Sequence, residues 1–199
     1  MYLPRRFENT DVEKSLEVIR AAPLATLISQ NAQLEPFISH IPLVAVQEGE
    51  TIVLYGHLAK ANPHAQLLQD KKIYAIFHGP EAYITPRWYT EHDVPTWNYA
   101  VVHIQGQVQE LPDRAGVLQC LEKLTAHVDP EWRFELPEDL QAPERFIVGF
   151  RITVESMKSK FKMGQNRSAA DQKGVIHGLE KNGDDRSLAV MEYMKRNLL

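Results

Sequence analysis

Short segments rich in β-branched and aromatic residues follow one another closely along most of the chain, and they constrain the fold more than any other feature. Such residues favour strands, and the Asn, Gly and Pro residues between the segments favour turns. The spacing leaves too little chain for the helical crossovers that a parallel sheet needs. The sequence therefore predicts an antiparallel barrel or an α+β sheet. The expected strands are residues 24–29, 37–46, 51–55, 73–77, 82–85, 99–108, 146–154 and 158–163.

Helices are expected between and after these strands. A capping box at Thr10 to Glu13 predicts a first helix over residues 11–21, and Asn62-Pro63 predicts the start of a short second one. Residues 129–144 are acidic and contain three prolines, so an irregular segment is expected there. A further helix is expected from residue 112, and the chain from residue 168 onward should be helical, with a break at 181–185.

The overall composition is that of a globular protein that functions inside the cell. The 199 residues carry a formal net charge of −4, whereas a general nucleic-acid binder is usually basic. A single cysteine, Cys120, excludes an internal disulfide framework and fits a reducing compartment. The N-terminal segment lacks the apolar core of a signal peptide, and no apolar run approaches the roughly 20 residues of a membrane span. We therefore expect a cytoplasmic protein with no membrane partner.

The segment from His57 to His64 combines a cation with a predicted helix start. The free N–H groups and partial positive charge of a helix start attract anions. Lys60 lies just before that start, which is formed by Asn62. Two interpretations remain open for this segment, a phosphate site or a capped surface helix with a solvated lysine.

A second basic segment, KSKFKMGQNR, spans residues 158–167. Side chains alternate between the two faces of a strand, so Lys158, Lys160 and Lys162 are expected on one face. Gln165 follows as a donor for a polar ligand. The row of lysines either faces an anion or protects a sheet edge from pairing with another molecule.

Aromatic residues gather between positions 83 and 99, and they include Trp88 and Trp97. Aromatic faces stack on planar ligands and contribute to dimer contacts. Thr96 and Asn98, on either side of Trp97, can form hydrogen bonds to the edge of a ligand. The alternative is an aromatic cluster that closes the mouth of a barrel without any ligand.

Other motifs with defined chemistry are absent from the sequence. It has no dinucleotide or phosphate-binding glycine loop, no H-E-x-x-H and no G-x-S-x-G. Its eight histidines lack metal-ligand spacing, so no metal site is expected. Cys120 is expected on the inner face of a helix as a small apolar residue. No catalytic residue is assigned.

Four segments resemble the PaiB-type FMN-binding negative transcriptional regulator family. In chain order they are GHLAKANPH, GPEAYITPRWY, VPTWNY and KFKMGQNR, and the N-terminal MYLPRRF fits as well. The family is related to split-barrel flavoproteins such as pyridoxamine-phosphate oxidases and flavin reductases. The resemblance spans nearly the whole chain. It departs from the usual pattern at Arg87, where the family more often has Ser, and at Met163-Gly164, where it more often has Leu-Ser.

The resemblance implies a mainly β, α+β fold: a six-stranded antiparallel split barrel with peripheral helices. It also implies a homodimer with FMN bound near the subunit interface. Residues 1–167 would form the FMN-binding domain, and residues 168–199 a C-terminal helical extension packed on it. The phosphate of FMN needs cations and donors, and its ring needs a flat surface. The residues expected to contact FMN are His57, Lys60, Asn62, Trp88, Thr96, Trp97, Asn98, Lys160, Lys162 and Gln165.

The leading hypothesis is a dimeric FMN-binding protein that represses transcription. Nothing in the sequence indicates direct DNA contact, which would require a local basic patch. The alternative is a flavin-dependent oxidoreductase or flavin reductase, which moves hydride between a nicotinamide or small-molecule reductant and FMN. A third hypothesis is a haem-binding split barrel with His57 as the axial ligand.

Overall fold

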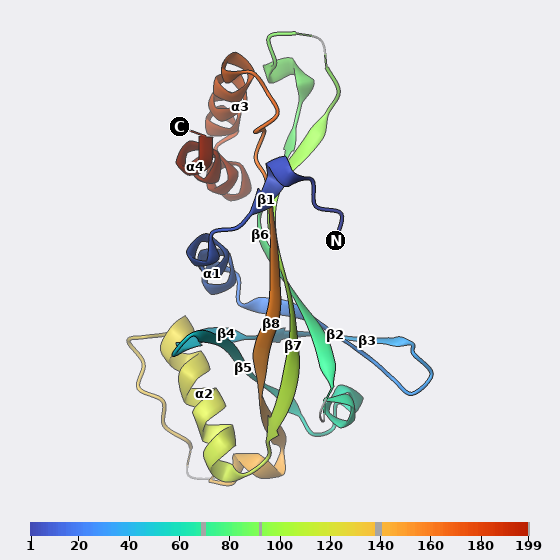
Figure 1. Cartoon of the computed structure of the whole chain (residues 1–199). Helices are drawn as coiled ribbons and strands as arrows, with labels where there is room; N and C mark the ends of the chain where they lie inside the picture. The colour runs from blue at the N-terminus through green and yellow to red at the C-terminus, as the bar shows by residue number, and fades with distance from the viewer. Residues whose placement is uncertain (69–70, 92, 138–140, 199) are drawn as a thin grey trace. The chain divides into compact units, whose positions relative to one another are not determined.

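The computed structural model describes residues 1–68, 71–91, 93–137 and 141–198. Its strands belong to one sheet in the order β3-β2-β6-β7-β8-β5-β4, and β1 pairs with β8 (Figure 1). The described part holds eight strands rather than the six that the resemblance implied. The strands are β1 (Glu8–Asn9), β2 (Leu24–Gln30), β3 (Pro36–Pro42), β4 (Val44–Glu48), β5 (Thr51–Ala59), β6 (Lys72–Ile84), β7 (Thr96–Leu111) and β8 (Ile147–Lys162).

Four α-helices occur in the described ranges, and each of them is too short or too polar to span a bilayer. The first begins where the sequence predicted, but its capping side chain is Asp11 rather than Thr10, because Asp11 accepts hydrogen bonds from the N–H groups of Glu13 and Lys14. The helices are α1 (Val12–Ala21), α2 (Arg114–Val128), α3 (Ala169–Asn182) and α4 (Asp185–Leu198). Short 3₁₀ helices are η1 (Arg5–Phe7), η2 (Pro63–Leu67), η3 (Pro86–Trp88) and η5 (Pro143–Arg145).

The chain divides into two compact units, and each is described by itself. Unit 1 comprises residues 1–18, 78–102 and 158–199, and unit 2 comprises residues 19–77 and 103–157. The separation of residues 1–167 from a C-terminal extension at 168–199 remains a prediction of the sequence.

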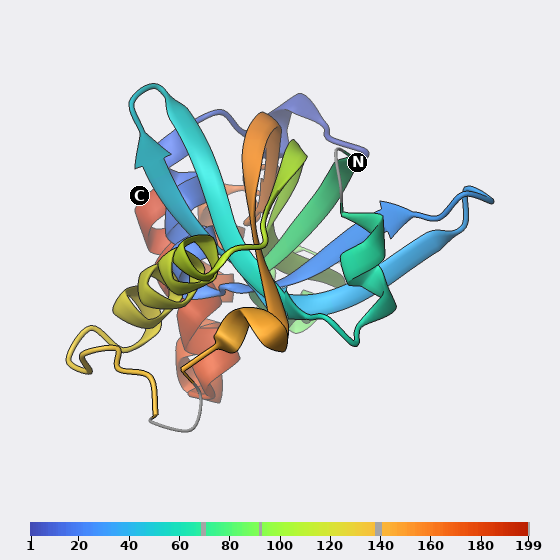
Figure 2. The ribbon, with the colours of Figure 1, turned by 90° about the horizontal axis from the view of Figure 1, so that it is seen from below.

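Unit 2 is an antiparallel β-structure with α2 packed against β4 and β5 (Figure 2). Alternate residues of β2 are buried, as expected for a strand with one face in a core, whereas β5 buries the four consecutive residues 53–56. On β8, Phe150 is fully buried and lies opposite Gly56 of β5. Asp113 begins α2 by accepting a hydrogen bond from the N–H of Gly116. Cys120 is fully buried in this helix, and burial raises the pKa of its thiol to about 11, which confirms its apolar role.

Unit 1 contains the ends of β6 and β8, the start of β7, and the helices α3 and α4, which lie side by side (Figure 1). The predicted alternation on β8 is confirmed, since Phe161 and Met163 are buried whereas Lys158 is exposed. Phe161 packs on Tyr193 of α4, with 6.0 Å between ring centroids. Helix α4 therefore covers the apolar face of β8, and the lysines occupy the opposite face.

Several predicted strand boundaries were wrong. Residues 37–46 belong to two strands, because the pairing with neighbouring strands is interrupted at Leu43. The N–H of Leu43 donates to the carbonyl of Pro23, and its side chain is buried. Conversely, Gly79-Pro80 does not end a strand, and β6 continues through it. A Cβ on Gly79 would lie 3.0 Å from a Val18 methyl and 3.1 Å from Ala100, so the glycine there permits close packing.

Candidate functional site

Aromatic rings and a lysine share one surface of unit 1, which we call the aromatic–lysine face and define as Tyr83, Trp97, Tyr99 and Lys160. Tyr83 and Trp97 are 48% and 50% exposed, and their ring centroids lie 6.0 Å apart at an interplanar angle of 70°. The Lys160 Nζ lies 5.4 Å from the centroid of the Tyr99 ring and 5.6 Å from that of Tyr2. These distances are within the range of cation–π attraction. The face thus offers flat rings and a cation.

Lys162 lies two residues beyond Lys160 on the same strand, and among the described residues its ammonium bonds to neutral groups. It donates to the Thr96 hydroxyl and to the carbonyl of Trp97, the latter at 2.7 Å. Within the described ranges, neither lysine forms an ion pair with a carboxylate. Burial, and secondarily the charge of Lys160, lowers the pKa of Lys162. Two uncompensated positive charges therefore lie close together.

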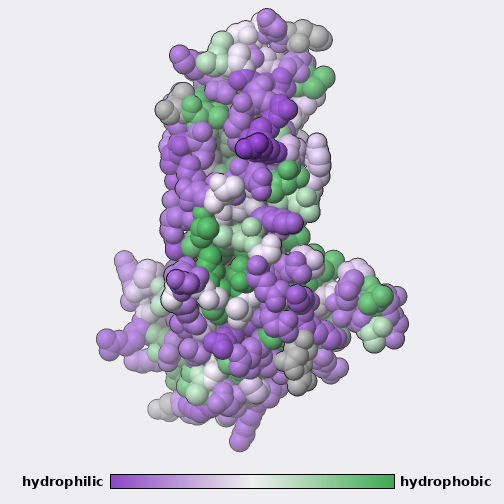
Figure 3. All heavy atoms as spheres, viewed as in Figure 1, coloured by the Kyte–Doolittle hydropathy of each residue, from purple (hydrophilic) through white to green (hydrophobic). Residues whose placement is uncertain are grey.

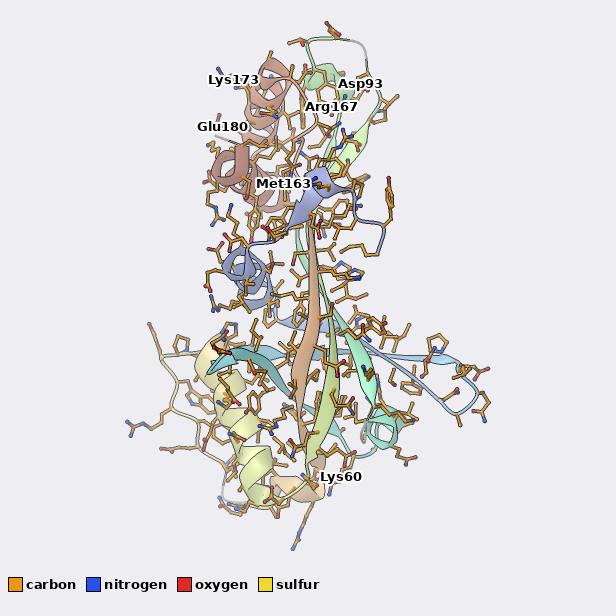
Figure 4. The ribbon with its side chains drawn as sticks, in the orientation of Figure 1. Lys60, Asp93, Met163, Arg167, Lys173 and Glu180 are labelled. Carbon is orange, nitrogen blue, oxygen red and sulfur yellow. The ribbon has the colours of Figure 1, made fainter. Side chains whose placement is uncertain are left out.

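A small cavity of about 80 Å³ lies beside the Lys162 ammonium, and we call it the Lys162 cavity. Asn98 lines it and is only 3% exposed. Arg167 also lines it, forms an ion pair with Asp93, and stacks over Tyr89 with its guanidinium carbon 4.6 Å from the ring centroid (Figure 4). The cavity is lined by Tyr89, Thr96, Asn98, Lys162, Gly164, Asn166, Arg167, Gln172, Val175 and Met194.

Gln165 has a local role in the turn after β8. Its side-chain oxygen accepts a hydrogen bond of 2.7 Å from the N–H of Met163, and its amide nitrogen donates to the carbonyl of Phe161. Gly164 in the same turn has φ of +85°, in the left-handed region where a residue with a side chain is strained. Glycine adopts this conformation without strain.

Trp88 packs on a pair of glycines in α3 that the sequence reasoning missed. A Cβ on Gly174 would lie 2.1 Å from the Trp88 carbonyl oxygen, and a Cβ on Gly178 would lie 2.3 Å from the indole ring. The Gly-x-x-x-Gly spacing on a helix was the signal that could have revealed this contact. Trp88 and Trp97 also line one open pocket of about 280 Å³, with Arg87 among its other residues.

His57, Lys60 and Asn62 belong to unit 2. Lys60 is exposed, and its backbone N–H donates to the carbonyl of Phe146 at 2.8 Å (Figure 4). The predicted short helix after it is confirmed, with Asn62 as its N-cap and Pro63 at its first position, and η2 is a 3₁₀ helix of five residues. The Asn62 side chain accepts a hydrogen bond of 3.0 Å from the N–H of His64. Lys60 itself stays a predicted phosphate ligand.

Two histidines in unit 2 are buried in different ways. Both ring nitrogens of His64 are hydrogen-bonded, to the hydroxyls of Ser29 at 2.9 Å and Ser39 at 2.8 Å, so it is a structural core residue. The Nδ1 of His57 is buried and has no hydrogen-bond partner among the described residues. Burial lowers the pKa of both imidazoles, which favours their neutral form.

Acidification should therefore destabilise the protein. As the pH falls through 6.5, the ordinary pKa of histidine, the unfolded histidines take up protons before the folded ones do, so stability decreases. We expect a lower free energy of unfolding in urea at about pH 5.5 than at about pH 7.5, and a smaller decrease in His64→Gln. The exposed His177→Gln serves as the control. If the free energy of unfolding fell equally on acidification in His64→Gln and His177→Gln, the buried His64 would not be a source of the pH dependence.

The donor set fits a flavin mononucleotide. The Lys160 and Lys162 ammonium groups suit a phosphate, and the rings of the aromatic–lysine face suit a planar, amphipathic group. The buried His57 Nδ1 is a further polar atom, with no hydrogen-bond partner in the described part of the chain. A single pocket shared by His57, Lys60 and the unit 1 residues remains a prediction of the sequence.

The fold and the donor set define a flavin-binding split barrel, and comparison with known proteins identifies the family. Residues 1–156 match the family described as "Putative FMN-binding domain". The chain belongs to this FMN-binding family, which confirms the predicted flavin cofactor. "Protease synthase and sporulation protein PAI 2" of Bacillus subtilis is 30% identical over 206 residues, covering 100% of this chain and 98% of that protein. The predicted PaiB-type family is thus confirmed.

Solved structures confirm the fold class. The flavocytochrome Anf3 of Azotobacter vinelandii superimposes with a TM-score of 0.63 at 16% identity, over 80% of this chain and 72% of that chain. The FAD and haem binding protein of Mycobacterium smegmatis gives a TM-score of 0.63 at 15% identity, over 83% of this chain and 78% of that chain. At these identities the likeness establishes the shared fold alone.

Proposed function

We propose that this protein is a homodimeric FMN-binding regulator of the PaiB type that acts in transcriptional repression. The observation that carries the proposal is the pair of ammonium groups of Lys160 and Lys162, which have no carboxylate partner among the described residues and lie close to aromatic rings in a chain of an FMN-binding family. Its relative PAI 2 is named as a sporulation protein, which supports a regulatory role. The net charge of −4 favours repression through a partner rather than through general DNA contact.

The roles of the residues follow from their chemistry. Lys162 and Lys160 donate charge-assisted hydrogen bonds to the phosphate, which are about twice as strong as neutral ones. Trp97 and Tyr99 provide surface for the flavin ring, and Thr96 and Asn98 provide polar groups at its edge. When bound, FMN supplies the capacity to accept and release a hydride or single electrons.

A row of apolar residues in unit 2 supports the homodimer. Ile28 of β2 lies opposite Ile38 of β3 and opposite Tyr74 of β6, and both Ile38 and Tyr74 are exposed. Figure 3 shows apolar surface between hydrophilic residues on the face in view. An exposed apolar strip across three strands is a surface that a second copy of the chain can cover.

An absorption spectrum of the purified protein, with the native mass measured on the same sample, tests the proposal. We expect a yellow protein that releases FMN on denaturation and has twice the mass of the 22.8 kDa chain. Salt-sensitive retention of promoter DNA, directly or with a partner protein, would support the regulator. Rapid bleaching by NAD(P)H would instead assign a flavin-dependent oxidoreductase, and a Soret band would assign a haem protein.

Replacement of Lys60 by alanine should weaken FMN binding by about 1.5–3 kcal/mol, the value of a hydrogen bond to a charged group. The dissociation constant can be measured from the quenching of flavin fluorescence. Lys71→Ala, an exposed lysine in the same unit, is the matched control and should bind FMN as the wild type does. An unchanged dissociation constant in Lys60→Ala would remove Lys60 from the site.

A further inference from the structure

We propose that a surface at the C-terminal end of α2 binds a basic, extended segment of a partner protein. The surface surrounds an open hollow of about 560 Å³. It is formed by residues 122, 125 and 126 of α2 and by residues 130–134, and we call it the α2-end surface. All of these residues belong to unit 2, and none of them is among the residues assigned to FMN.

Helix α2 presents one side to the core of unit 2 and another side to the hollow. Cys120 belongs to a buried hydrophobic cluster with Tyr55 of β5. Residues 122, 125 and 126 line the hollow instead, and their spacing of three and four places them on one stripe of the helix. The hollow therefore lies on a side of α2 that this cluster does not cover.

The segment that follows α2 places two aromatic rings at the hollow. The N–H of Asp129 donates to the carbonyl of Thr125 at 2.8 Å, and the N–H of Trp132 donates to the carbonyl of Asp129 at 3.1 Å, so the chain turns directly after the helix. Trp132 is 52% exposed, and its ring centroid lies 6.0 Å from that of Phe134 at an interplanar angle of 86°. Tryptophan is enriched among the few residues that dominate the binding energy of an interface. The exposed Trp132 ring, held by a turn and by a second ring, is therefore a suitable anchor for a partner.

The charges around these rings select a basic partner. Glu122 and Glu131 line the hollow, and Asp129 and Glu135 are close to them in the chain. All four side chains are exposed, and none forms an ion pair with another described residue. Arg133 is the one cationic residue that lines the hollow in the described part of the chain. The surface therefore carries an excess of carboxylates.

Lys123 of α2 does not offset this excess at the hollow. Its ammonium lies 4.7 Å from the centroid of the buried Tyr55 ring, on the core side of the helix. A partner that approaches the α2-end surface thus meets the carboxylates without this lysine between them.

An arginine or lysine side chain of the partner fits both features of the surface. Its cation can lie over the face of Trp132, where cation–π attraction acts within about 6 Å, and it can form charge-assisted hydrogen bonds with the carboxylates. An apolar side chain of the same segment would cover the Phe134 ring. Nucleic acids do not fit, because the carboxylates repel their phosphates. The use of this surface in repression through a partner rests on the proposed function, whereas the binding itself does not.

A synthetic peptide in which arginine alternates with leucine is the probe, and a peptide with glutamate in place of arginine is its counterpart. Binding is measured by the fluorescence anisotropy of the labelled peptides. The variants are Trp132→Ala and Glu131→Lys. The matched controls are Phe146→Ala, another exposed aromatic residue of unit 2, and Glu50→Lys, another exposed glutamate of that unit.

We expect the arginine peptide to bind the wild type and both controls with the same affinity, and to bind at least about tenfold more weakly to Trp132→Ala and to Glu131→Lys. Its affinity for the wild type should decrease as the salt concentration rises, because salt screens exposed charges. The glutamate peptide should not bind.

Three results would overturn the proposal. The first is no binding of the arginine peptide, or equal binding of both peptides. The second is an equal loss of affinity in Glu50→Lys and Glu131→Lys, because the general negative charge would then be responsible. The third is a halved native mass of Trp132→Ala, because the surface would then be occupied by a second copy of the chain.

The same samples separate this surface from the proposed function. Specific binding of the arginine peptide by a protein that binds no flavin would refute the proposed function and support the α2-end surface. Flavin binding without peptide binding would overturn the α2-end surface alone.

Discussion

Replacing Phe150 by alanine should lower the free energy of unfolding by about 3–5 kcal/mol, the usual cost of removing a large buried aromatic side chain. The side chain of Phe150 is fully buried in the core, and Phe150 lies opposite Gly56. A Cβ on Gly56 would approach the Phe150 ring to 3.1 Å, so the ring fills the space that the glycine leaves. Alanine leaves that space empty, because neighbouring strands cannot close over it.

Urea unfolding of Phe146→Ala provides the control for this measurement. Phe146 is also a phenylalanine of unit 2, but it is 62% exposed. Its replacement should change the free energy of unfolding by no more than about 0.5 kcal/mol, as for most surface positions. Similar losses in the two variants would show that Phe150 is not part of the core.

The double replacement Gly174→Ala/Gly178→Ala should destabilise the protein by about 2–6 kcal/mol, since each added methyl group overpacks a filled site at a typical cost of about 1–3 kcal/mol. At Gly174 the obstacle is the backbone carbonyl of Trp88, which cannot rotate away as a side-chain tip can. The sign of the effect is informative, because Gly→Ala in an unobstructed helix interior stabilises by about 1 kcal/mol per site.

His177→Ala tests the same helix at an exposed position, where the free energy of unfolding should change little. Thermal and urea unfolding of the double variant then report on the contact between Trp88 and α3. If the double variant were more stable than the wild type, Trp88 would not pack against Gly174 and Gly178.

The sequence predicted local structure well where one strong pattern acted alone. The two-residue alternation in 158–163 correctly separated the lysines from Phe161 and Met163, and the Pro112 region correctly predicted α2 with Cys120 inside. The prediction failed where tertiary packing, rather than the local preference of the residues, decided the secondary structure. Gly79-Pro80 is a typical turn signal, yet β6 continues through it. Val18 and Ala100 pack closely against Gly79, and this tertiary packing is not visible in the local sequence.

The sequence predicted the residue types of the candidate site, but it did not predict all of the contacts that these residues make. The lysines, Thr96 and Asn98 were identified from residue type, and the structure groups Thr96, Asn98 and Lys162 around one cavity. The local engagement of Gln165 and the contact of Trp88 with α3 depend on tertiary structure. No spacing rule in a single sequence reveals such contacts between residues that are distant along the chain.

The sulfur contact of Asn98 has a consequence for the stability of the protein. A thioether is a weak acceptor, so the hydrogen bond from the buried Asn98 amide to Met194 stabilises the fold less than a bond to an oxygen would.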